Sequence, residues 1–92
     1  MYDLSFHPRF KRDIKGLSEE GISILYELIT RLKENPLICD QLIGDLKDVY
    51  RCKLKLRKVD YRLAYLIEEN YIKILMFKKR ESFYKALKRM IN

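Results

Sequence analysis

Apolar and basic side chains alternate without exception over residues 50–57. The apolar positions are Tyr50, Cys52, Leu54 and Leu56, and the basic positions are Arg51, Lys53, Lys55 and Arg57. Successive side chains of a β-strand point to opposite faces of its sheet, so this pattern predicts a strand. One face of that strand lies in a core and the other is wholly cationic. The fold must therefore contain a sheet whose buried face and basic face are distinct.

The remainder of the second half predicts a run of tight connections. Residues 57–60 form a turn, residues 61–67 form the next strand, and residues 68–70 form a second turn. Residues 71–77 are more continuously apolar, which is typical of a central strand. Helical spacing returns over residues 82–91. We therefore expect an antiparallel meander that is followed by a helix.

The first half predicts one strand and a pair of helices. Residues 2–6 alternate between apolar and polar side chains, as in a short strand. Pro8 suits the first position of a helix that ends near Gly16. Ser18 is a good N-cap for a second helix, which Pro36 ends. The two helices form an antiparallel hairpin.

These segments give the order β-α-α-β-β-β-α, with residues 36–48 as a connection around Gly44. The predicted fold class is α+β: a small antiparallel sheet packs on the N-terminal helical hairpin, and a helix follows at the C-terminus. A chain of 92 residues has room for one core, so we expect a single domain over residues 1–92.

The sequence favours a cytoplasmic protein. No apolar stretch approaches the ~20 residues that a membrane span needs, and residues 1–15 lack the apolar stretch of a signal peptide. Cys39 and Cys52 match neither a disulfide framework nor a metal site. We expect Cys52 to fill the core and Cys39 to be a loop thiol, which fits a reducing compartment.

The net charge of +7 is concentrated in two segments of the second half. Residues 46–62 carry seven Lys or Arg and two Asp or Glu, and residues 78–92 carry six and one. Residues 1–45, by contrast, carry six basic and eight acidic side chains. Two basic segments that converge would form a patch for a polyanion, and nucleic acid is the first candidate. The alternative is a lysine-rich surface that only maintains solubility.

Several kinds of catalytic site lack the residues that they need. The only histidine, His7, cannot build a zinc site with two distant cysteines and is expected at the surface or in a cap. The three glycines form no phosphate-binding loop. The acidic residues lie mostly on the first helices or in turns, so we expect no metal site and no cofactor. Lysine, arginine and tyrosine remain as the chemically useful side chains.

Those three side chains permit cleavage of RNA without a metal. Attack by a 2′-hydroxyl on the neighbouring phosphate needs a base, stabilisation of a dianionic phosphorane, and a proton for the departing 5′-oxygen. Arginine suits the phosphorane because its planar fork binds two phosphate oxygens. A lysine can be the base where neighbouring positive charges favour loss of its proton. Tyrosine can stack on a base or relay a proton.

Four motifs, in this order along the chain, resemble the RelE/ParE toxins of bacterial and archaeal type II toxin–antitoxin modules. They are Leu42-Ile43-Gly44-Asp45-Leu46, Tyr50-Arg51-Cys52-Lys53-Leu54, Asp60-Tyr61-Arg62-Leu63-Ala64-Tyr65 and Lys79-Arg80-Glu81-Ser82-Phe83-Tyr84. The resemblance spans nearly the whole chain, since the predicted order of elements is also that of the family.

The resemblance to the RelE branch implies a catalytic set. Lys53 is the candidate general base, Arg62 would stabilise the phosphorane, and Arg80 would do the same or aid the leaving group. Tyr84 would stack on a base or donate a proton. Arg51 stands where the RelE pattern often has a lysine, which leaves one fewer possible base. Further RNA contacts are expected from the neighbouring cations, Arg51, Lys55, Lys78 and Lys79.

The resemblance also implies an activity and partners. Similar toxins cut mRNA in the ribosomal A site, where ribosomal RNA is a further contact, and are bound by an acidic antitoxin in a hetero-oligomer. One alternative is inhibition of DNA gyrase, as for toxins that resemble ParE, although these generally lack the full basic and aromatic set. A second alternative is a nucleic-acid-binding domain without catalysis. A further alternative for Lys53 and its neighbours is a solvated sheet face without a functional role, and the alternative for Tyr84 is a packing residue.

Overall fold

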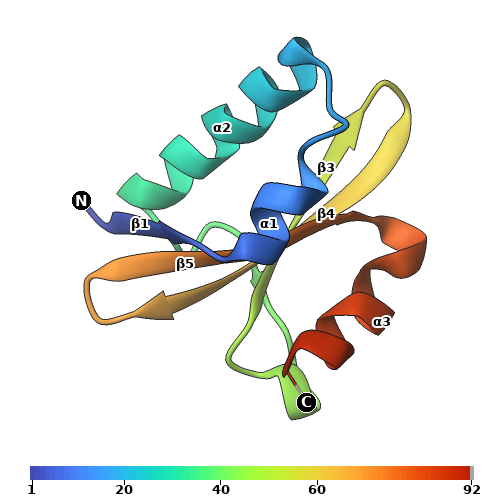
Figure 1. Cartoon of the computed structure of the whole chain (residues 1–92). Coiled ribbons are helices and arrows are strands. Elements are labelled where there is room, and N and C mark those ends of the chain that lie inside the picture. Colours follow the sequence, from blue (N-terminus) through green and yellow to red (C-terminus); the bar gives the residue numbers. More distant parts are fainter. Residues whose placement is uncertain (92) are drawn as a thin grey trace.

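The computed structural model describes residues 1–91. Figure 1 shows a twisted sheet with helices on both sides. The elements, in chain order, are β1 (Asp3–Phe6), α1 (Pro8–Asp13), α2 (Glu19–Glu34), β2 (Asp40–Gln41), the short 3₁₀ helix η1 (Gly44–Leu46), β3 (Tyr50–Leu56), β4 (Val59–Glu68), β5 (Tyr71–Lys79) and α3 (Arg80–Ile91). The predicted α+β class is confirmed. No helix within residues 1–91 is long and apolar enough to cross a membrane.

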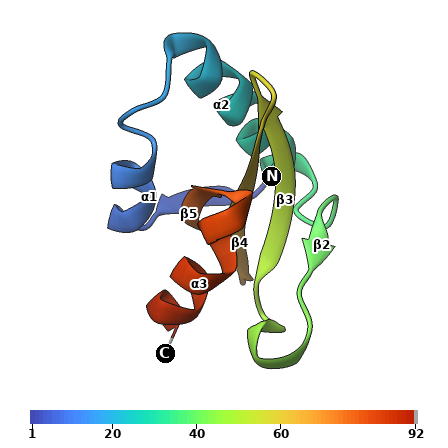
Figure 2. The ribbon, with the colours of Figure 1, turned by 90° about the vertical axis from the view of Figure 1, so that its right-hand side faces the viewer.

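The sheet is built on the predicted meander. Its strand order is β1-β5-β4-β3-β2, and β3, β4 and β5 pair antiparallel in sequence order. The continuously apolar β5 is an interior strand, because β1 adds to its other edge in parallel. Edge strand β2 pairs antiparallel with β3, as Figure 2 shows.

Both N-terminal helices begin at the predicted residues and α2 ends just before Pro36, whereas α1 ends at Asp13, short of the expected Gly16. Pro8 opens α1, and Nδ1 of His7 caps it by accepting from the backbone N–H of Arg9 at 3.0 Å. The hydroxyl of Ser18 accepts from Gly21 N–H at 3.0 Å and caps α2. Each cap satisfies a backbone donor that the first helical turn leaves without a partner. The predicted capping role of His7 is confirmed.

Two groups of apolar side chains fill opposite faces of the sheet. Under α1 and α2, strand residues such as Leu63 and Phe77 pack with Phe10 and Leu25. Under α3, the neighbouring strand residues Ala64 and Met76 pack with Phe83 and Leu87. Figure 1 shows α2 and α3 on either side of the sheet. We call these the α1/α2 face and the α3 face.

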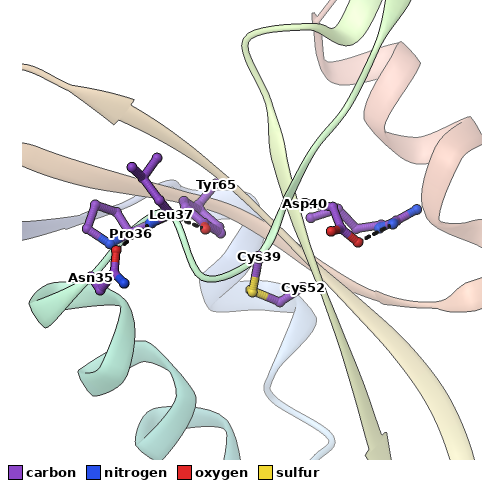
Figure 3. The surroundings of a disulfide bond; sticks show 8 residues. Asn35, Pro36, Leu37, Cys39, Asp40, Cys52 and Tyr65 are labelled. Atoms are coloured by element: carbon purple, nitrogen blue, oxygen red, sulfur yellow. Dashed lines mark hydrogen bonds and ion pairs between the residues drawn. A yellow bond between two sulfur atoms is a disulfide. The ribbon is translucent and has the colours of Figure 1, made fainter.

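The cysteines differ from the prediction. Cys39 and Cys52 form a disulfide, with their Cα atoms 5.1 Å apart (Figure 3), so the expectation of two separate thiols is wrong. The reason lies in β2, which the sequence left inside an irregular connection. Pairing of β2 with β3 carries Cys39 to the position beside Cys52. The prediction of a buried Cys52 is confirmed.

Candidate functional site

A row of three cations crosses the sheet on the α3 face. Lys53 of β3 lies opposite Arg62 of β4, and Arg62 lies opposite Lys78 of β5. Residues directly opposite each other in an antiparallel pair project from the same face, with Cβ atoms about 4.5–5.5 Å apart. We call Lys53, Arg62 and Lys78 the basic row. The register thus brings together cations from both of the basic segments.

The structure neutralises one end of the basic row. Lys78 Nζ lies 2.8 Å from Oδ1 of Asp13, whose side chain is only 3% exposed. The other oxygen of that carboxylate accepts from Phe77 N–H at 3.0 Å. Asp13 thereby ties the end of α1 to β5, beyond the point where β1 stops pairing. Lys78 has a structural partner in addition to any ligand.

The other end of the row carries no such compensation. Within the part of the chain that the structure describes, Lys53, Arg62 and Arg80 form no ion pair. Arg62 donates from Nη1 to the carbonyl of Tyr61 at 3.0 Å, which holds its side chain. Like charges placed opposite each other repel. An incoming anion such as a phosphate would relieve that repulsion.

Arg51 links the sheet to α3. Its Nη1 donates to the hydroxyl of Tyr84 at 2.6 Å, and its Nη2 forms an ion pair with Oδ2 of Asp40 at 2.8 Å. The Arg51 side chain is 18% exposed. The hydrogen bond to Tyr84 is the main cause that raises the pKa of Arg51, followed among the raising causes by the hydrogen bond to Asp40. Tyr84 is 39% exposed and therefore accessible to a ligand.

The Arg51–Tyr84 contact borders a shallow pocket. Its volume is about 330 Å³, and its remaining lining is Gln41, Leu42, Ile43 and Leu46. The aromatic ring of Tyr84 packs edge-on against the buried Phe83, with centroids 4.9 Å apart. The pocket combines an apolar wall with an arginine and a phenol. Such a surface is suited to a flat aromatic group that carries a phosphate.

The remaining predicted residues lie around this centre in different ways. Lys55 faces Asp60 in an exposed ion pair at 3.6 Å. Lys79 lies opposite Tyr61, whose ring stacks on Phe77 on the α1/α2 face, so it projects away from the basic row. Arg80 begins α3 directly after the strand. The structure thus gathers Lys53, Arg62, Arg51 and Tyr84 around the α3 face, and it separates Lys79 from them.

Sequence reasoning missed two carboxylates at the site. Asp40 and Asp13 each neutralise one of the predicted cations, Arg51 and Lys78. In the sequence, Asp40 stands out only because it follows a cysteine, and nothing around Asp13 indicates that it forms an ion pair. Residues 1–91 contain no group of three or more His, Cys, Asp or Glu side chains placed to hold a metal.

Comparisons with known proteins agree with this architecture. The sequence profile of a family described as the ParE-like toxin of type II bacterial toxin–antitoxin systems matches residues 4–88. No curated protein shows a significant match.

Several solved structures are similar to the chain. One is in the Escherichia coli RelBE toxin–antitoxin complex: it is 27% identical, has a TM-score of 0.69, and the match covers 86% of this chain and 96% of that one. The isolated E. coli RelE toxin is 25% identical, with a TM-score of 0.68 and coverage of 98% and 99%. The RelBE2 complex of Mycobacterium tuberculosis, at 23% identity, a TM-score of 0.74 and coverage of 86% and 98%, supports the fold alone. Because the family profile covers most of the chain, the protein belongs to the ParE-like toxins of type II toxin–antitoxin systems, within the RelE/ParE superfamily.

Proposed function

We propose that this toxin is a metal-free, ribosome-dependent mRNA endonuclease. The observation that carries the proposal is the pair of opposed cations Lys53 and Arg62, which have no carboxylate partner among residues 1–91, beside the Arg51–Tyr84 contact. Two such charges on one sheet face favour a dianionic group over a neutral one. The phosphorane of RNA cleavage is such a group.

Each predicted catalytic residue has a role in this reaction. Lys53 removes the proton of the 2′-hydroxyl, whose oxygen forms a bond to phosphorus. Arg62 holds the phosphorane oxygens, and Arg80 adds charge at the start of α3. Tyr84 donates a proton to the departing 5′-oxygen as the phosphorus–oxygen bond breaks. The products are a 2′,3′-cyclic phosphate and a free 5′-hydroxyl.

The intramolecular contacts of the other predicted cations indicate how much each can contribute to RNA binding. Lys55 has only an exposed ion pair, which exchanges readily with a phosphate. Arg51 lines the pocket beside Tyr84, where a nucleobase stacks on the ring. Lys78 and Lys79 contribute less, because Asp13 neutralises the first and the second lies on the other face.

The proposed partners include an antitoxin as well as RNA. Similar structures come from RelBE toxin–antitoxin complexes. An acidic antitoxin that covers the basic row would block the site in a hetero-oligomer. In the active state, the partners are mRNA in the ribosomal A site and the ribosomal RNA around it.

Mapping of mRNA 5′ ends after a brief pulse of expression tests the proposal. The wild-type chain is expected to create new ends within the codons of translated messages. Lys53→Ala and Arg62→Ala should each reduce cleavage by at least about 100-fold, since a base or an oxyanion donor contributes about that much. Lys15→Ala, at an exposed lysine between α1 and α2, is the control and should cleave like the wild type.

Other outcomes would point to other functions. Growth arrest without new 5′ ends, retained in Lys53→Ala and accompanied by a DNA-damage response, would indicate a gyrase inhibitor. Salt-sensitive RNA binding without cleavage would indicate a binding domain without catalysis. Purified ribosomes programmed with mRNA then show whether cleavage needs the ribosome, since free RNA should remain uncut.

A further inference from the structure

A covalent cross-link lies next to the Arg51–Tyr84 contact, on the opposite face of the sheet. In the antiparallel register of β2 and β3, Asp40 lies opposite Arg51. The disulfide joins the adjacent pair, because Cys39 precedes Asp40 and Cys52 follows Arg51 in the chain. Cys52 belongs to the core of the α1/α2 face, whereas Arg51 reaches Tyr84 on the α3 face. Figure 3 shows Asp40 on the side toward α3, away from the disulfide. The cross-link therefore anchors β2 from one face while Asp40 acts on the other.

Besides the disulfide, Asp40 is held by the pairing of β2 with β3 and by hydrogen bonds of its chain neighbours, such as Gln41 Nε2 to the Lys47 carbonyl at 2.6 Å. Strand β2 has only two residues and lies at the edge of the sheet. The Asp40 side chain is 70% exposed, and exposed ion pairs order their partners weakly. The hydrogen bond of Tyr65 with the Pro36 carbonyl, at 2.5 Å, anchors the chain before β2. The Leu42 N–H to Val49 carbonyl bond, at 2.8 Å, anchors it afterwards. The disulfide is the covalent restraint between these anchors.

The Arg51–Tyr84 hydrogen bond has only one possible direction. A guanidinium has donors and no acceptor, so Arg51 donates and the Tyr84 oxygen accepts. The Tyr84 proton is then left to donate elsewhere, as a proton donor to a leaving group requires. Asp40 occupies the second terminal nitrogen of the same guanidinium. By fixing Arg51 at two points, Asp40 also determines where the Tyr84 proton can point.

We propose that the Cys39–Cys52 disulfide and Asp40 form a redox-controlled positioning device for Arg51 and the Tyr84 hydroxyl. The inference rests on the proposed function, since positioning of Tyr84 matters for RNA cleavage. A dithiol reductant opens the device. A thiolate of the reductant attacks Sγ of Cys39, which belongs to the more exposed of the two cysteines, and releases Cys52 as a thiolate. A second exchange leaves two protein thiols and an oxidised dithiol, a transfer of two electrons and two protons.

The first test compares cleavage of ribosome-bound mRNA by oxidised protein and by protein reduced with dithiothreitol. Reduction is expected to lower the single-turnover rate at saturating substrate by about tenfold, since a shift of ~1 Å at a catalytic group can cost up to ~100-fold. Asp40→Asn should lower it similarly, and Cys39→Ser should be slow and insensitive to the reductant. The control is Asp3→Asn, the same change at an exposed carboxylate of β1 on the opposite edge of the sheet.

A second readout does not depend on cleavage. In protein labelled with ¹³C at the tyrosine ζ carbon, the Tyr84 resonance reports the hydrogen bond to its hydroxyl. Reduction, Cys39→Ser and Asp40→Asn should each move this resonance in the same direction. Tyr71, whose hydroxyl donates to Glu68 at the far end of β4, should not move. The double variant Cys39→Ser/Asp40→Asn should shift no further than the single variants, because both changes act through Arg51.

The outcomes separate the two proposals. A shift of the Tyr84 resonance together with slower cleavage supports the device. A shift with no cleavage in either redox state supports the positioning and overturns the proposed endonuclease. An unmoved Tyr84 resonance after complete reduction, verified by thiol titration, overturns the device whatever the cleavage rate. An unchanged cleavage rate in reduced protein overturns the redox control.

Discussion

At the scale of single residues, the structure separates cations that serve the fold from cations that are left for a ligand. Lys78 and Lys53 belong to the same basic row and look alike in the sequence. Lys78, however, pairs with a buried carboxylate, whereas Lys53 has no such partner in the described part of the chain. A buried carboxylate that loses its partner is costly, whereas an exposed lysine can be removed cheaply. The same side chain therefore contributes to stability at one position and is available for chemistry at the other.

Lys78→Ala is expected to lower the free energy of unfolding by about 1–2 kcal/mol, because Asp13 then keeps only the Phe77 N–H as a partner. Urea unfolding measures the change. Lys79→Ala, at the exposed neighbouring lysine, is the matched control and should change stability by less than about 0.5 kcal/mol. In an Asp13→Asn background, Lys78→Ala should cost less. Equal stability of the two alanine variants would contradict a stabilising ion pair.

At the scale of elements, the connection between α2 and β3 is more ordered than its sequence indicates. It contains β2 and η1, and it begins at Pro36, whose carbonyl accepts from the buried hydroxyl of Tyr65 (Figure 3). The ring of Tyr65 also stacks on that of Tyr50, with centroids 5.4 Å apart. One side chain of the central strand β4 thus fixes where the connection starts. The disulfide fixes where it meets the sheet.

Burial raises the pKa of the Tyr65 hydroxyl well above its ordinary value. In the unfolded chain this tyrosine loses its proton above a pH of about 10, whereas in the folded chain it keeps the proton. The unfolded state then binds fewer protons, so stability falls as the pH rises. Between pH of about 9 and about 11, the wild type should lose about 1.4 kcal/mol relative to Tyr65→Phe.

Chemical unfolding at several pH values measures this difference. Near neutral pH, Tyr65→Phe should be the less stable protein by about 1–2 kcal/mol, since the buried Pro36 carbonyl loses its donor. The gap should close as the pH rises. A gap that stays constant up to a pH of about 11 would mean that Tyr65 ionises alike in both states.

At the scale of the whole molecule, two faces of one sheet have different tasks. The α1/α2 face holds the larger group of buried side chains, and the disulfide lies within it. The α3 face carries a smaller apolar group beside the basic row. Because α3 covers only part of this face, charges can gather there without breaking the core. The larger core and the disulfide thus lie on the α1/α2 face, and the residues of the proposed reaction lie on the α3 face.

The disulfide should contribute to the stability of the whole chain as well as to the site. It closes a short loop, since its cysteines are separated by 13 positions. A loop of this size is expected to add about 3 kcal/mol, mainly by restricting the unfolded chain. Reduced wild type and Cys39→Ser should therefore both be less stable than oxidised wild type by about that amount in urea unfolding. A reductant that leaves the unfolding midpoint unchanged after full reduction would refute this contribution.

Features that depend on near neighbours in the chain could be predicted from the sequence. The alternation around Lys53 established a strand with a basic face, and Ser18 and Pro36 marked the ends of α2. Such patterns can be read directly because side-chain period and capping are local. The same alternation put Arg51 and Lys53 on one face, and the register of β3 and β4 added Arg62 to it. Their catalytic roles remain predictions.

Tertiary structure decided which distant residues meet. The pairing of Cys39 with Cys52, of Asp13 with Lys78 and of β1 with β5 depends on register between segments that are far apart in the chain. Extension of β5 to Lys79 decided that Lys78 and Lys79 face opposite sides. A shift of one residue in register would reverse these faces, and no local pattern encodes it. The positions of the charged side chains on the strands could therefore be predicted from the sequence, whereas their ion-pair partners could be identified only from the tertiary structure.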